Sequence, residues 1–349
     1  MTSAAGRAID ADGHIRDDDT LLRKYLAAPY NDRVFLGTGA PRDGWDNSMG
    51  GTLGTRAVDA KVWLEALDAG GLEQSVLYPT SNLGAGWLRE PDFALARCMA
   101  YNDLLSEEYL KVSPRFRGVA LLPAQDPAAA AQELCRCVTE LGMVGGVFTE
   151  GPYLLGKREF DPIYKEAQRL DVPITIHGSG RIHGMIEEHM FERFVQVHSI
   201  GHPFTQMKQF TSMIFEGVPE RFPDLRLGFL EAGCGWVVYL LDRMDERYHL
   251  RGAVEAPVLT KSPSEYVADG NIFISMESDE RLLPTTLDIL GDDIFMFASD
   301  FPHWDAEFPA NIQYMLSRTD LSETVKSKIT RENAIRLYGI SEPSTTVRR

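Results

Sequence analysis

Short runs of hydrophobic residues alternate with helix-type patterns along most of the chain. Eight such runs occur, at residues 8–15, 74–80, 116–125, 144–151, 172–180, 225–233, 271–277 and 293–302. They are apolar at consecutive positions, which is typical of parallel strands that are covered on both faces. The segments between them carry the spacing of amphipathic helices, at residues 57–71, 91–112, 127–142 and 160–171. The pattern therefore predicts repeated strand–helix units.

The number of units predicts the fold. Eight strand–helix units in one chain indicate an α/β protein with a (β/α)8 TIM barrel. A doubly wound sheet is the alternative, but no G-x-G-x-x-G motif follows the first strand. We expect one barrel domain over residues 8–340, an N-terminal tail at 1–7 and a disordered tail at 341–349. Two long connections, residues 16–56 and 178–220, follow the first and fifth strands and should lie over the catalytic face.

The acidic composition narrows the range of partners. The chain has 35 Lys and Arg against 51 Asp and Glu, a formal net charge of −16. Nucleic acids and anionic membranes bind basic patches, so we expect neither as a partner. The apolar stretches are shorter than the ~20 residues of a membrane span, and the N-terminus has no hydrophobic signal core. These features predict a cytoplasmic protein that acts on a small molecule, and they leave a homo-oligomer open.

Polar side chains stand at the ends of four predicted strands. The first strand ends with Asp12 and His14, which are two residues apart and so point the same way. The fifth strand ends with His177, the sixth with Glu231 and the eighth with Asp300. Catalytic residues of TIM barrels come from the carboxyl ends of several strands. We therefore expect these side chains to converge.

A pair of histidines after the fifth strand adds to this group. His198 and His202 are four residues apart and would share one face of a helix, which we expect Pro203 to end. Imidazole and carboxylate groups are ligands for zinc, iron and manganese. Seven candidates exceed the three or four protein ligands of one catalytic zinc, which predicts two metal ions. The candidate ligands are Asp12, His14, His177, His198, His202, Glu231 and Asp300.

Other residues are predicted to surround the metals. His303 follows Asp300 by three positions and should either orient that carboxylate or touch the substrate. Seven aromatic residues are candidates for the wall of the substrate pocket, and their number favours a hydrophobic small molecule. They are Phe35, Trp45, Trp87, Phe204, Trp236, Phe301 and Trp304.

Taken together, these motifs resemble the amidohydrolase superfamily, in its amidohydrolase-2 branch. The resemblance is carried by IDADGHI, ITIHGSG, HPFTQM, FPDLRLGFLEAGCGW and FASDFPH. Typical members are zinc- or manganese-dependent hydrolases and non-oxidative decarboxylases on a (β/α)8 barrel. This chain departs from them at two places. Its first strand has Asp12-x-His14 where H-x-H or E-x-H is usual, and Glu231 stands where the sixth strand usually carries a histidine.

With these departures the sequence is most similar to the dinuclear non-haem iron monooxygenases of the branch. These include the hydroxylase type of platensimycin and platencin diterpenoid biosynthesis and the isobutylamine N-hydroxylase type. The resemblance implies two irons, or iron with manganese, and O2 and an external electron donor or reductase as partners. It implies hydroxylation of a hydrophobic small molecule such as a diterpenoid or another natural-product intermediate.

The carboxylate-rich ligand set favours this interpretation, because anionic oxygen ligands stabilise high oxidation states of iron. We expect Glu231 and Asp300 to be catalytic. The alternative is a zinc- or manganese-dependent hydrolase or non-oxidative decarboxylase; in the hydrolase, Asp300 would be the base. A metal-free binding protein on the same barrel is a third class.

Overall fold

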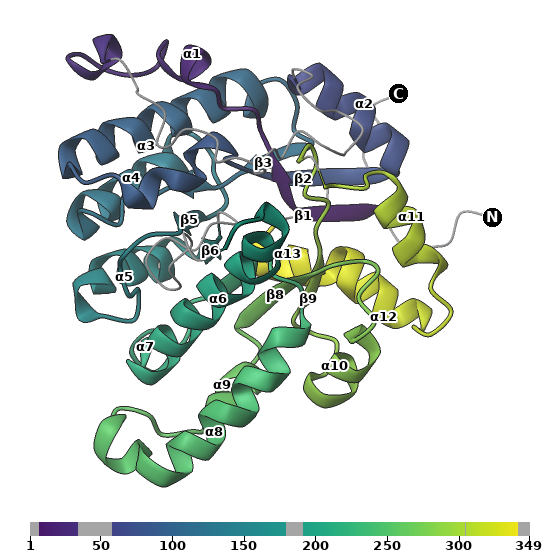
Figure 1. The fold of residues 1–349 in the computed structure, drawn as a ribbon. Coiled ribbons are helices and arrows are strands. Elements are labelled where there is room, and N and C mark those ends of the chain that lie inside the picture. The colour runs from purple at the N-terminus through teal and green to yellow at the C-terminus, as the bar shows by residue number, and fades with distance from the viewer. Residues whose placement is uncertain (1–6, 34–57, 179–190, 304, 341–349) are drawn as a thin grey trace.

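A computed structural model describes residues 7–33, 58–178, 191–303 and 305–340. Within these ranges, parallel strands lie at the centre and helices surround them (Figure 1). The strands are β1 (Ala8–His14), β2 (Leu72–Tyr78), β3 (Phe116–Gly118), β4 (Ala120–Leu121), β5 (Gly146–Thr149), β6 (Ile174–His177), β7 (Leu227–Leu230), β8 (Ile272–Met276) and β9 (Phe295–Phe297). The predicted α/β barrel class is confirmed.

The strands pair in chain order and in parallel. One sheet has the order β1-β2-β3 and the other runs from β4 to β9. The predicted third strand is divided at Val119, which separates β3 from β4. The seam between β9 and β1 has no regular ladder in the described residues, but backbone hydrogen bonds cross it just beyond β9. Asp300 N donates to Asp12 O over 3.0 Å, and His14 N donates to Phe301 O over 2.7 Å.

Helices follow most of the strands. The longer ones are α2 (Ala60–Gly70), α3 (Pro91–Leu105), α4 (Pro127–Thr139), α5 (Asp161–Leu170), α6 (Phe194–Phe215), α8 (Gly235–Glu255), α10 (Leu283–Leu290) and α11 (Ala310–Ser317). The shorter ones are α1 (Asp19–Leu22), α7 (Val218–Arg221), α9 (Pro263–Ala268), α12 (Glu323–Ser327) and α13 (Asn333–Tyr338). The 3-10 segments are η1 (Tyr30–Asp32), η2 (Ser81–Trp87) and η4 (Arg158–Phe160), and the π-helical turns are η3 (Ser106–Leu110) and η6 (Lys328–Glu332). The four predicted helices correspond to α2, to α3 with η3, to α4 and to α5.

Local sequence signals explain where several of these helices begin. The Asp59 side chain accepts a hydrogen bond from Val62 N at the start of α2. Asp126 caps α4 in the same way, and Pro127 occupies the first turn, where its missing N–H is not needed. Caps of this kind satisfy backbone donors that the helix itself leaves unpaired.

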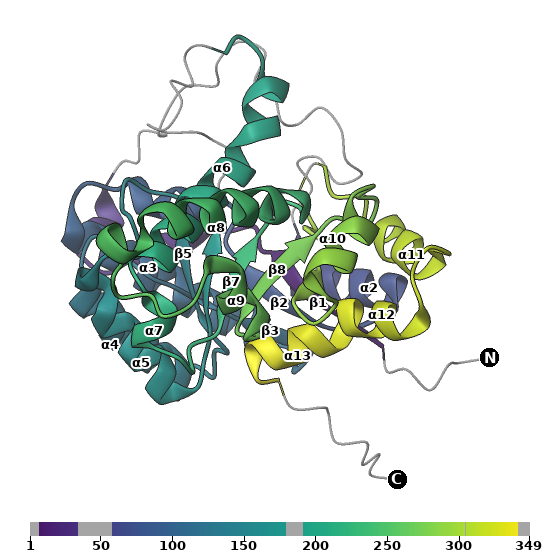
Figure 2. The ribbon, with the colours of Figure 1, turned by 90° about the horizontal axis from the view of Figure 1, so that it is seen from below.

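The predicted loop 178–220 is largely helical in its described part from 191 onward, and the prediction that Pro203 ends a helix there is wrong. The helix α6 continues through Pro203 for three more turns, to Phe215. A proline inside a helix removes one hydrogen bond. Here Phe210, Met213 and Ile214 are fully buried against the barrel, and this packing offsets that loss. Figure 2 shows α6 rising at one end of the barrel, with α13 at the opposite end.

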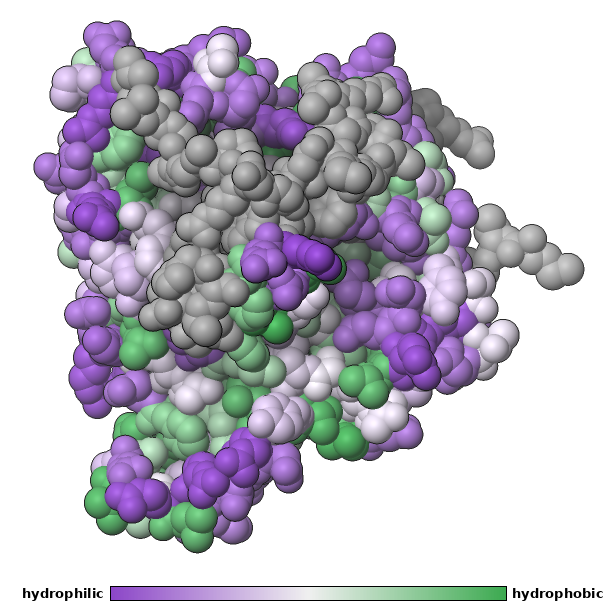
Figure 3. All heavy atoms as spheres, in the orientation of Figure 1, coloured by the Kyte–Doolittle hydropathy of each residue, from purple (hydrophilic) through white to green (hydrophobic). Residues whose placement is uncertain are grey.

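Large side chains of the strands are buried in the hydrophobic core. Phe148, Phe229, Phe273 and Phe295 are at most 1% exposed. The outer surface mixes hydrophilic and hydrophobic residues, as Figure 3 shows along the lower edge formed by α8. No helix in the described ranges is long and apolar enough to cross a membrane. The predicted tails at 1–6 and 341–349, and most of the loop 16–56, fall outside the described residues, and the single domain stays a prediction.

Candidate metal centre

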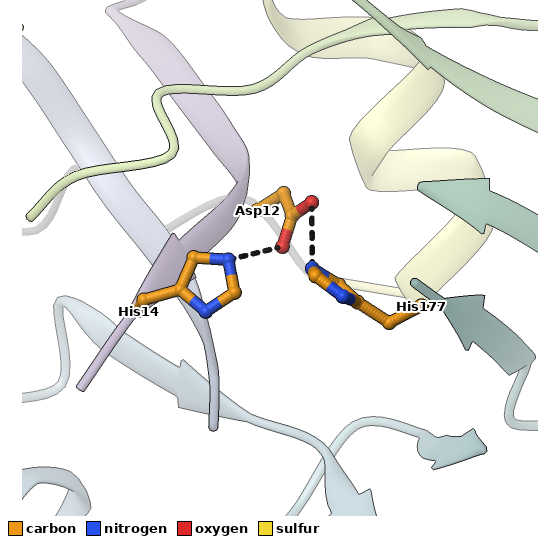
Figure 4. Close-up of side chains that lie close together, drawn as sticks. All are labelled: Asp12, His14 and His177. Carbon is orange, nitrogen blue, oxygen red and sulfur yellow. Dashed lines mark ion pairs between the residues drawn. The ribbon is translucent and has the colours of Figure 1, made fainter. Parts of the chain in front are cut away.

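Three predicted ligands meet at the carboxyl ends of β1 and β6. Asp12 and His14 lie on β1 and His177 ends β6, and all three are at most 1% exposed. The Nε2 atoms of His14 and His177 lie 3.5 Å from Oδ1 and Oδ2 of Asp12, respectively, so the carboxylate stands between the two imidazoles (Figure 4). The three residues form a group whose ligand atoms could hold one metal ion.

The two imidazoles are oriented by backbone carbonyls on their far sides. His14 Nδ1 lies 2.7 Å from Pro79 O, and His177 Nδ1 lies 2.6 Å from Gly178 O. A carbonyl only accepts hydrogen bonds, so each Nδ1 carries the proton and donates it. When the imidazole is neutral, its Nε2 is then a bare lone pair that faces the carboxylates. This arrangement is typical of histidines that bind a metal.

Asp300 and His303 extend the cluster on the β9 side. Asp300 Oδ1 lies 3.2 Å from His14 Nε2 and 2.8 Å from His303 Nδ1. The His303 ring stacks on His14 with centroids 3.9 Å apart. Its Nε2 lies 3.2 Å from the hydroxyl of Thr80. Therefore Asp300 can serve a metal and also hold His303 in place.

Glu231 completes the cluster from the end of β7. Its Oε2 lies 3.1 Å from His177 Nε2 and 3.4 Å from His202 Nδ1, and its Oε1 lies 3.6 Å from His303 Nδ1. Glu231 and Asp300 both adopt left-handed backbone conformations, with φ of 54° and 53°. Such strain in residues other than glycine concentrates at functional sites. Both carboxylates are thus held in place by the turns that end their strands.

The helix α6 brings His202 and His198 to the same face. Gln206, one turn after His202, donates its Nε2 to Ile176 O and Leu230 O over 3.0 and 2.7 Å. These two bonds fix α6 across the ends of β6 and β7. His198 lies farther out, where its Nε2 is 3.5 Å from Asp305 Oδ2 and its ring is 5.1 Å from that of His202. The structure therefore brings six predicted ligands together and places His198 at their edge.

Unpartnered atoms test whether this cluster fits a metal. Buried polar atoms normally have a hydrogen-bond partner, because an unsatisfied one costs free energy. Seven buried atoms of the cluster have none within the described residues. They are both carboxylate oxygens of Asp12, Nε2 of His14 and of His177, Nδ1 of His202, Oε2 of Glu231 and Oδ1 of Asp300. Imidazole nitrogens and carboxylate oxygens that face one another in this way fit a divalent cation.

The pKa values of the histidines and carboxylates in the cluster depend on their burial and on the charges of their neighbours. Burial lowers the pKa of His14, and it lowers that of His202 to about 3. Burial opposes protonation of His177 as well, but Asp12 and Glu231 raise its pKa to about 9. Burial and the charge of Asp300 raise the pKa of Glu231 to about 7.

The charges around His303 and Asp300 are coupled. Burial alone would lower the pKa of His303, but Asp300 and Glu231 raise it well above its usual range. Burial alone would raise the pKa of Asp300, but His303 and His14 hold it below its usual range. The pair is therefore an imidazolium beside a carboxylate.

The predicted aromatic pocket residues are placed unevenly. Trp236 is 6% exposed and packs between the rings of Phe210 and Phe229. Phe301 is also 6% exposed and packs edge-on against Trp63. Phe35, Trp45 and Trp304 fall outside the described residues. The rings of Trp236 and Phe301 belong to the hydrophobic core, and contact with substrate stays a prediction for all seven candidates.

Sequence analysis missed three residues that shape the site. Asp305 faces His198, Gln206 fixes α6, and Asp10 lies two residues before Asp12 on β1. Burial raises the pKa of Asp10 to about 6, although Ser75 and Ser299 donate hydrogen bonds that oppose the shift. The ladder is irregular between Asp10 and Gly13, so Asp10 points to the side of Gly13 and Ser75, and the spacing of two from Asp12 gives no signal for this.

Comparison with known proteins identifies relatives for most of the chain. A family model described as Amidohydrolase matches residues 77–340. The 2-amino-3-carboxymuconate-6-semialdehyde decarboxylase of Dictyostelium discoideum is 26% identical, over 82% of this chain and 79% of the relative. The γ-resorcylate decarboxylase of Rhodococcus jostii is 30% identical, over 68% of this chain and 74% of the relative.

Solved structures agree on the fold. The 5-carboxyvanillate decarboxylase of Sphingomonas paucimobilis has a TM-score of 0.75 at 22% identity and covers 96% of this chain and 99% of its own. A dihydroxybenzoic acid decarboxylase of a Polaromonas species, with bound manganese and the inhibitor 2-nitroresorcinol, has a TM-score of 0.71 at 20% identity. It covers 98% of this chain and 99% of its own.

These relatives correct the predicted reaction. The prediction of a dinuclear iron monooxygenase is wrong, because the relatives that cover most of the chain are decarboxylases. Iron, O2 and an external reductase lose their support with it. The alternative of a metal-dependent, non-oxidative decarboxylase agrees with the relatives. The ligand types misled the prediction because imidazole and carboxylate serve both kinds of chemistry.

Proposed function

Because this chain belongs to the amidohydrolase family of metal-dependent enzymes, we propose that it is a non-oxidative decarboxylase of a hydroxylated aromatic carboxylic acid. The observation that carries the proposal is the 30% identity to a γ-resorcylate decarboxylase over 68% of the chain. The buried Asp and His cluster at the carboxyl ends of the strands supports it independently, since it offers the ligands that such chemistry requires.

Four side chains would hold the first metal ion. Asp12, His14, His177 and Asp300 contribute unpartnered atoms that face one another. Manganese is our first choice, because a structurally similar decarboxylase contains it, and zinc is the alternative. A divalent ion held there would supply a positive charge that binds and polarises the oxygens of the substrate.

A second ion would account for the remaining unpartnered atoms. His202 Nδ1 and Glu231 Oε2 lie 3.4 Å apart, and neither has a hydrogen-bond partner in the described residues. We place the second ion at these two residues, with His198 next to them on α6. Elemental analysis of the purified protein measures the ratio directly, and one ion per chain would contradict this second position.

Decarboxylation also requires a proton at the carbon that loses CO2. The bond between that carbon and the carboxylate breaks, the electron pair stays on the carbon, and a proton takes the place of CO2. His303 is the residue placed to supply it, because Asp300 and Glu231 keep its imidazole protonated. His303 Nδ1 lies 2.8 Å from Asp300 Oδ1. Asp300 would then stabilise the imidazolium and orient it, and water would restore the proton after turnover.

The test is a decarboxylation assay with the metal-loaded protein. We expect Mn²⁺-loaded protein to release CO2 from 2,6-dihydroxybenzoate or 5-carboxyvanillate without O2 or a reductant. His303→Gln should keep Mn²⁺ bound but lose turnover by about 100-fold, since a positioned acid contributes about 10²–10⁴-fold.

Two results would contradict the proposal. One is protein that binds Mn²⁺ stoichiometrically and yet decarboxylates no member of a panel of hydroxybenzoates. The other is turnover of these acids at the wild-type rate after complete removal of the metal. Wild-type turnover in His303→Gln would leave the reaction in place and move the proton source to another residue.

A further inference from the structure

Asp10 is a buried carboxylate that the proposed mechanism does not use. It is 0% exposed and accepts four hydrogen bonds. Oδ1 accepts from Ser299 N over 2.8 Å and from Asp12 N over 3.3 Å. Oδ2 accepts from the hydroxyls of Ser75 and Ser299, each over 2.7 Å. The carboxylate is thus satisfied by hydrogen bonds alone.

Asp10 and Asp12 differ sharply although they are only two residues apart on β1, because the irregular ladder between Asp10 and Gly13 turns them to different sides of the strand. Both oxygens of Asp12 lack a hydrogen-bond partner, whereas both oxygens of Asp10 are occupied by donors. An ion can therefore bind Asp12 but has no free oxygen to bind at Asp10. The function of Asp10 must therefore lie in holding the residues that donate hydrogen bonds to it.

The donors of Asp10 come from both sides of the seam that closes the barrel. Ser75 belongs to β2, and Ser299 immediately precedes Asp300. The ladder between β1 and β2 is itself irregular from Asp10 to Gly13. At this point Asp10 takes the place of ladder hydrogen bonds and ties the segment after β9 to β1. The Ser299 hydroxyl also accepts from Phe301 N over 3.1 Å, which fixes both neighbours of Asp300.

Gly13 supplies the room that this arrangement needs. A Cβ atom at position 13 would lie 2.4 Å from Ser75 Oγ and 2.7 Å from Asp10 Oδ2. Contacts that short would force the carboxylate away from its donors. The absence of a side chain at Gly13 is therefore required for the Asp10–Ser75 hydrogen bond.

We propose that Asp10 is a positioning residue that sets the distance between the metal-binding side chains of β1 and Asp300 by holding Ser299. The inference rests on the metal site proposed above. In that site, Asp300 Oδ1 lies 3.2 Å from His14 Nε2, across the seam. A shift of Ser299 would carry Asp300 with it, because the two residues are consecutive.

Ser75 and Ser299 provide a matched pair of variants for the test. Each donates one hydroxyl to the same oxygen of Asp10 over the same distance. Only Ser299 is joined to a metal-binding residue. We would measure the Kd for Mn²⁺ by electron paramagnetic resonance, together with the spectrum of the bound ion and the melting temperature of the metal-free protein.

The expected result separates the two serines. Ser299→Ala should weaken Mn²⁺ binding by about tenfold or more and change the spectrum of the bound ion, since residues that orient a ligand are worth about 10–100-fold. Ser75→Ala should weaken binding by less than about threefold under the same principle. Equal effects of the two variants on Kd would overturn the inference.

Variants of Asp10 itself separate position from charge. Asparagine can accept from Ser299 N and donate to the serine hydroxyl oxygens, because a hydroxyl both donates and accepts. Asp10→Asn should therefore keep the wild-type Kd within about threefold, whereas Asp10→Ala should lose the affinity that Ser299→Ala loses. Equal losses in the two Asp10 variants would overturn the inference in favour of a purely electrostatic role. Wild-type protein that fails to bind Mn²⁺ would overturn the proposed metal site and this inference together, whereas failure in the variants alone affects only Asp10.

Discussion

The two ends of the barrel treat their charged groups in opposite ways. At the amino ends of the strands, Arg226 donates to Asp171 Oδ1 and to Leu337 O, and Arg115 donates to Asp68 and to the carbonyls of Leu72 and Glu73. At the carboxyl ends, carboxylate oxygens and imidazole nitrogens of the cluster face one another, and seven of these atoms have no hydrogen-bond partner in the described residues. The charged groups at the amino ends are satisfied by hydrogen bonds within the protein, whereas the groups at the carboxyl ends have unpartnered atoms that a metal ion could bind.

The amino end of the barrel, where the charged groups are hydrogen-bonded, is also connected to the candidate metal centre through buried tyrosines. In the helix α13, the Tyr338 hydroxyl donates a hydrogen bond to Ala11 O over 2.7 Å, and it also lies 2.7 Å from the Tyr78 hydroxyl. Tyr78 in turn lies under His177, with ring centroids 5.7 Å apart. Residues at the amino end of the barrel thus support the candidate metal ligands through Tyr78. The contrast teaches that stability and reactivity are divided along the barrel axis, as is usual for this fold.

The largest effect should come from removing a ligand charge at the reactive end. Asp12→Asn should weaken Mn²⁺ binding by roughly 100-fold or more, since losing a residue that only orients a ligand already costs about 10–100-fold. The metal-free variant should be at least as stable as wild type, because a buried carboxylate without hydrogen bonds is replaced by a neutral amide. Calorimetric titration and thermal melting measure the two quantities. A variant that binds Mn²⁺ normally would show that Asp12 is not a ligand.

Metal removal should produce the next largest change. At a free Mn²⁺ concentration 100 times the Kd, binding stabilises the folded state by about 2.7 kcal/mol. We therefore expect a chelator to lower the melting temperature of the wild-type protein and Mn²⁺ to restore it in a concentration-dependent way. The metal-free Asp12→Asn protein serves as the control and should not respond. A chelator-insensitive melting temperature would remove the contrast between the two ends.

A substitution at the amino ends of the strands should lower stability and leave Mn²⁺ affinity unchanged. Arg331 donates to Glu73 and to Arg7 O, and all three lie at the amino ends of the strands. Glu73→Gln should lower the free energy of unfolding by about 1–2 kcal/mol, because it weakens a partly buried charged hydrogen bond. The Kd for Mn²⁺ should stay at the wild-type value. If Mn²⁺ affinity fell in proportion to stability, the two ends would be coupled rather than divided.

The last prediction is a pH dependence of metal affinity. Glu231 and His177 have pKa values raised to about 7 and about 9, so both hold protons at pH 6 and a metal must displace them. Mn²⁺ affinity should therefore rise with pH between 6 and 8, by about tenfold per unit for each displaced proton. Glu231→Gln should have a shallower slope, and Glu73→Gln the wild-type slope. An affinity that falls or stays constant over this range would contradict the proton assignments.

The sequence predicted the barrel and the positions of the strand ends because both depend on local pattern. Apolar runs locate buried strands, and a polar residue directly after such a run lies at the carboxyl end of the barrel. Pro203 was misjudged because its cost is local, whereas the packing of α6 that offsets it is tertiary. Val119 divides a strand in a way that hydrophobicity alone does not reveal.

Asp10 and the reaction type could not be predicted for different reasons. Asp10 has the same residue type as Asp12, and only its contacts with Ser75 and Ser299 distinguish a satisfied carboxylate from a bare one. Those contacts join residues up to 289 positions apart. The reaction was misassigned because a ligand set constrains which ions bind, while proton donors and substrate contacts decide what the bound ion does.

The seam that Asp10 closes also determines when the site can form during synthesis. Its two sides are β1 and the segment after β9. The partner of Asp10 across the seam is Ser299, which is synthesised 289 residues later. Closure between such distant segments is slow, because the entropy of a long loop must be lost before the contact forms. While Ser299 is still inside the ribosome, β1 exposes two acids and an imidazole with nothing to complete their geometry. The proposed metal ion would consequently bind late in maturation, once the segment that carries Ser299 and Asp300 has left the ribosome.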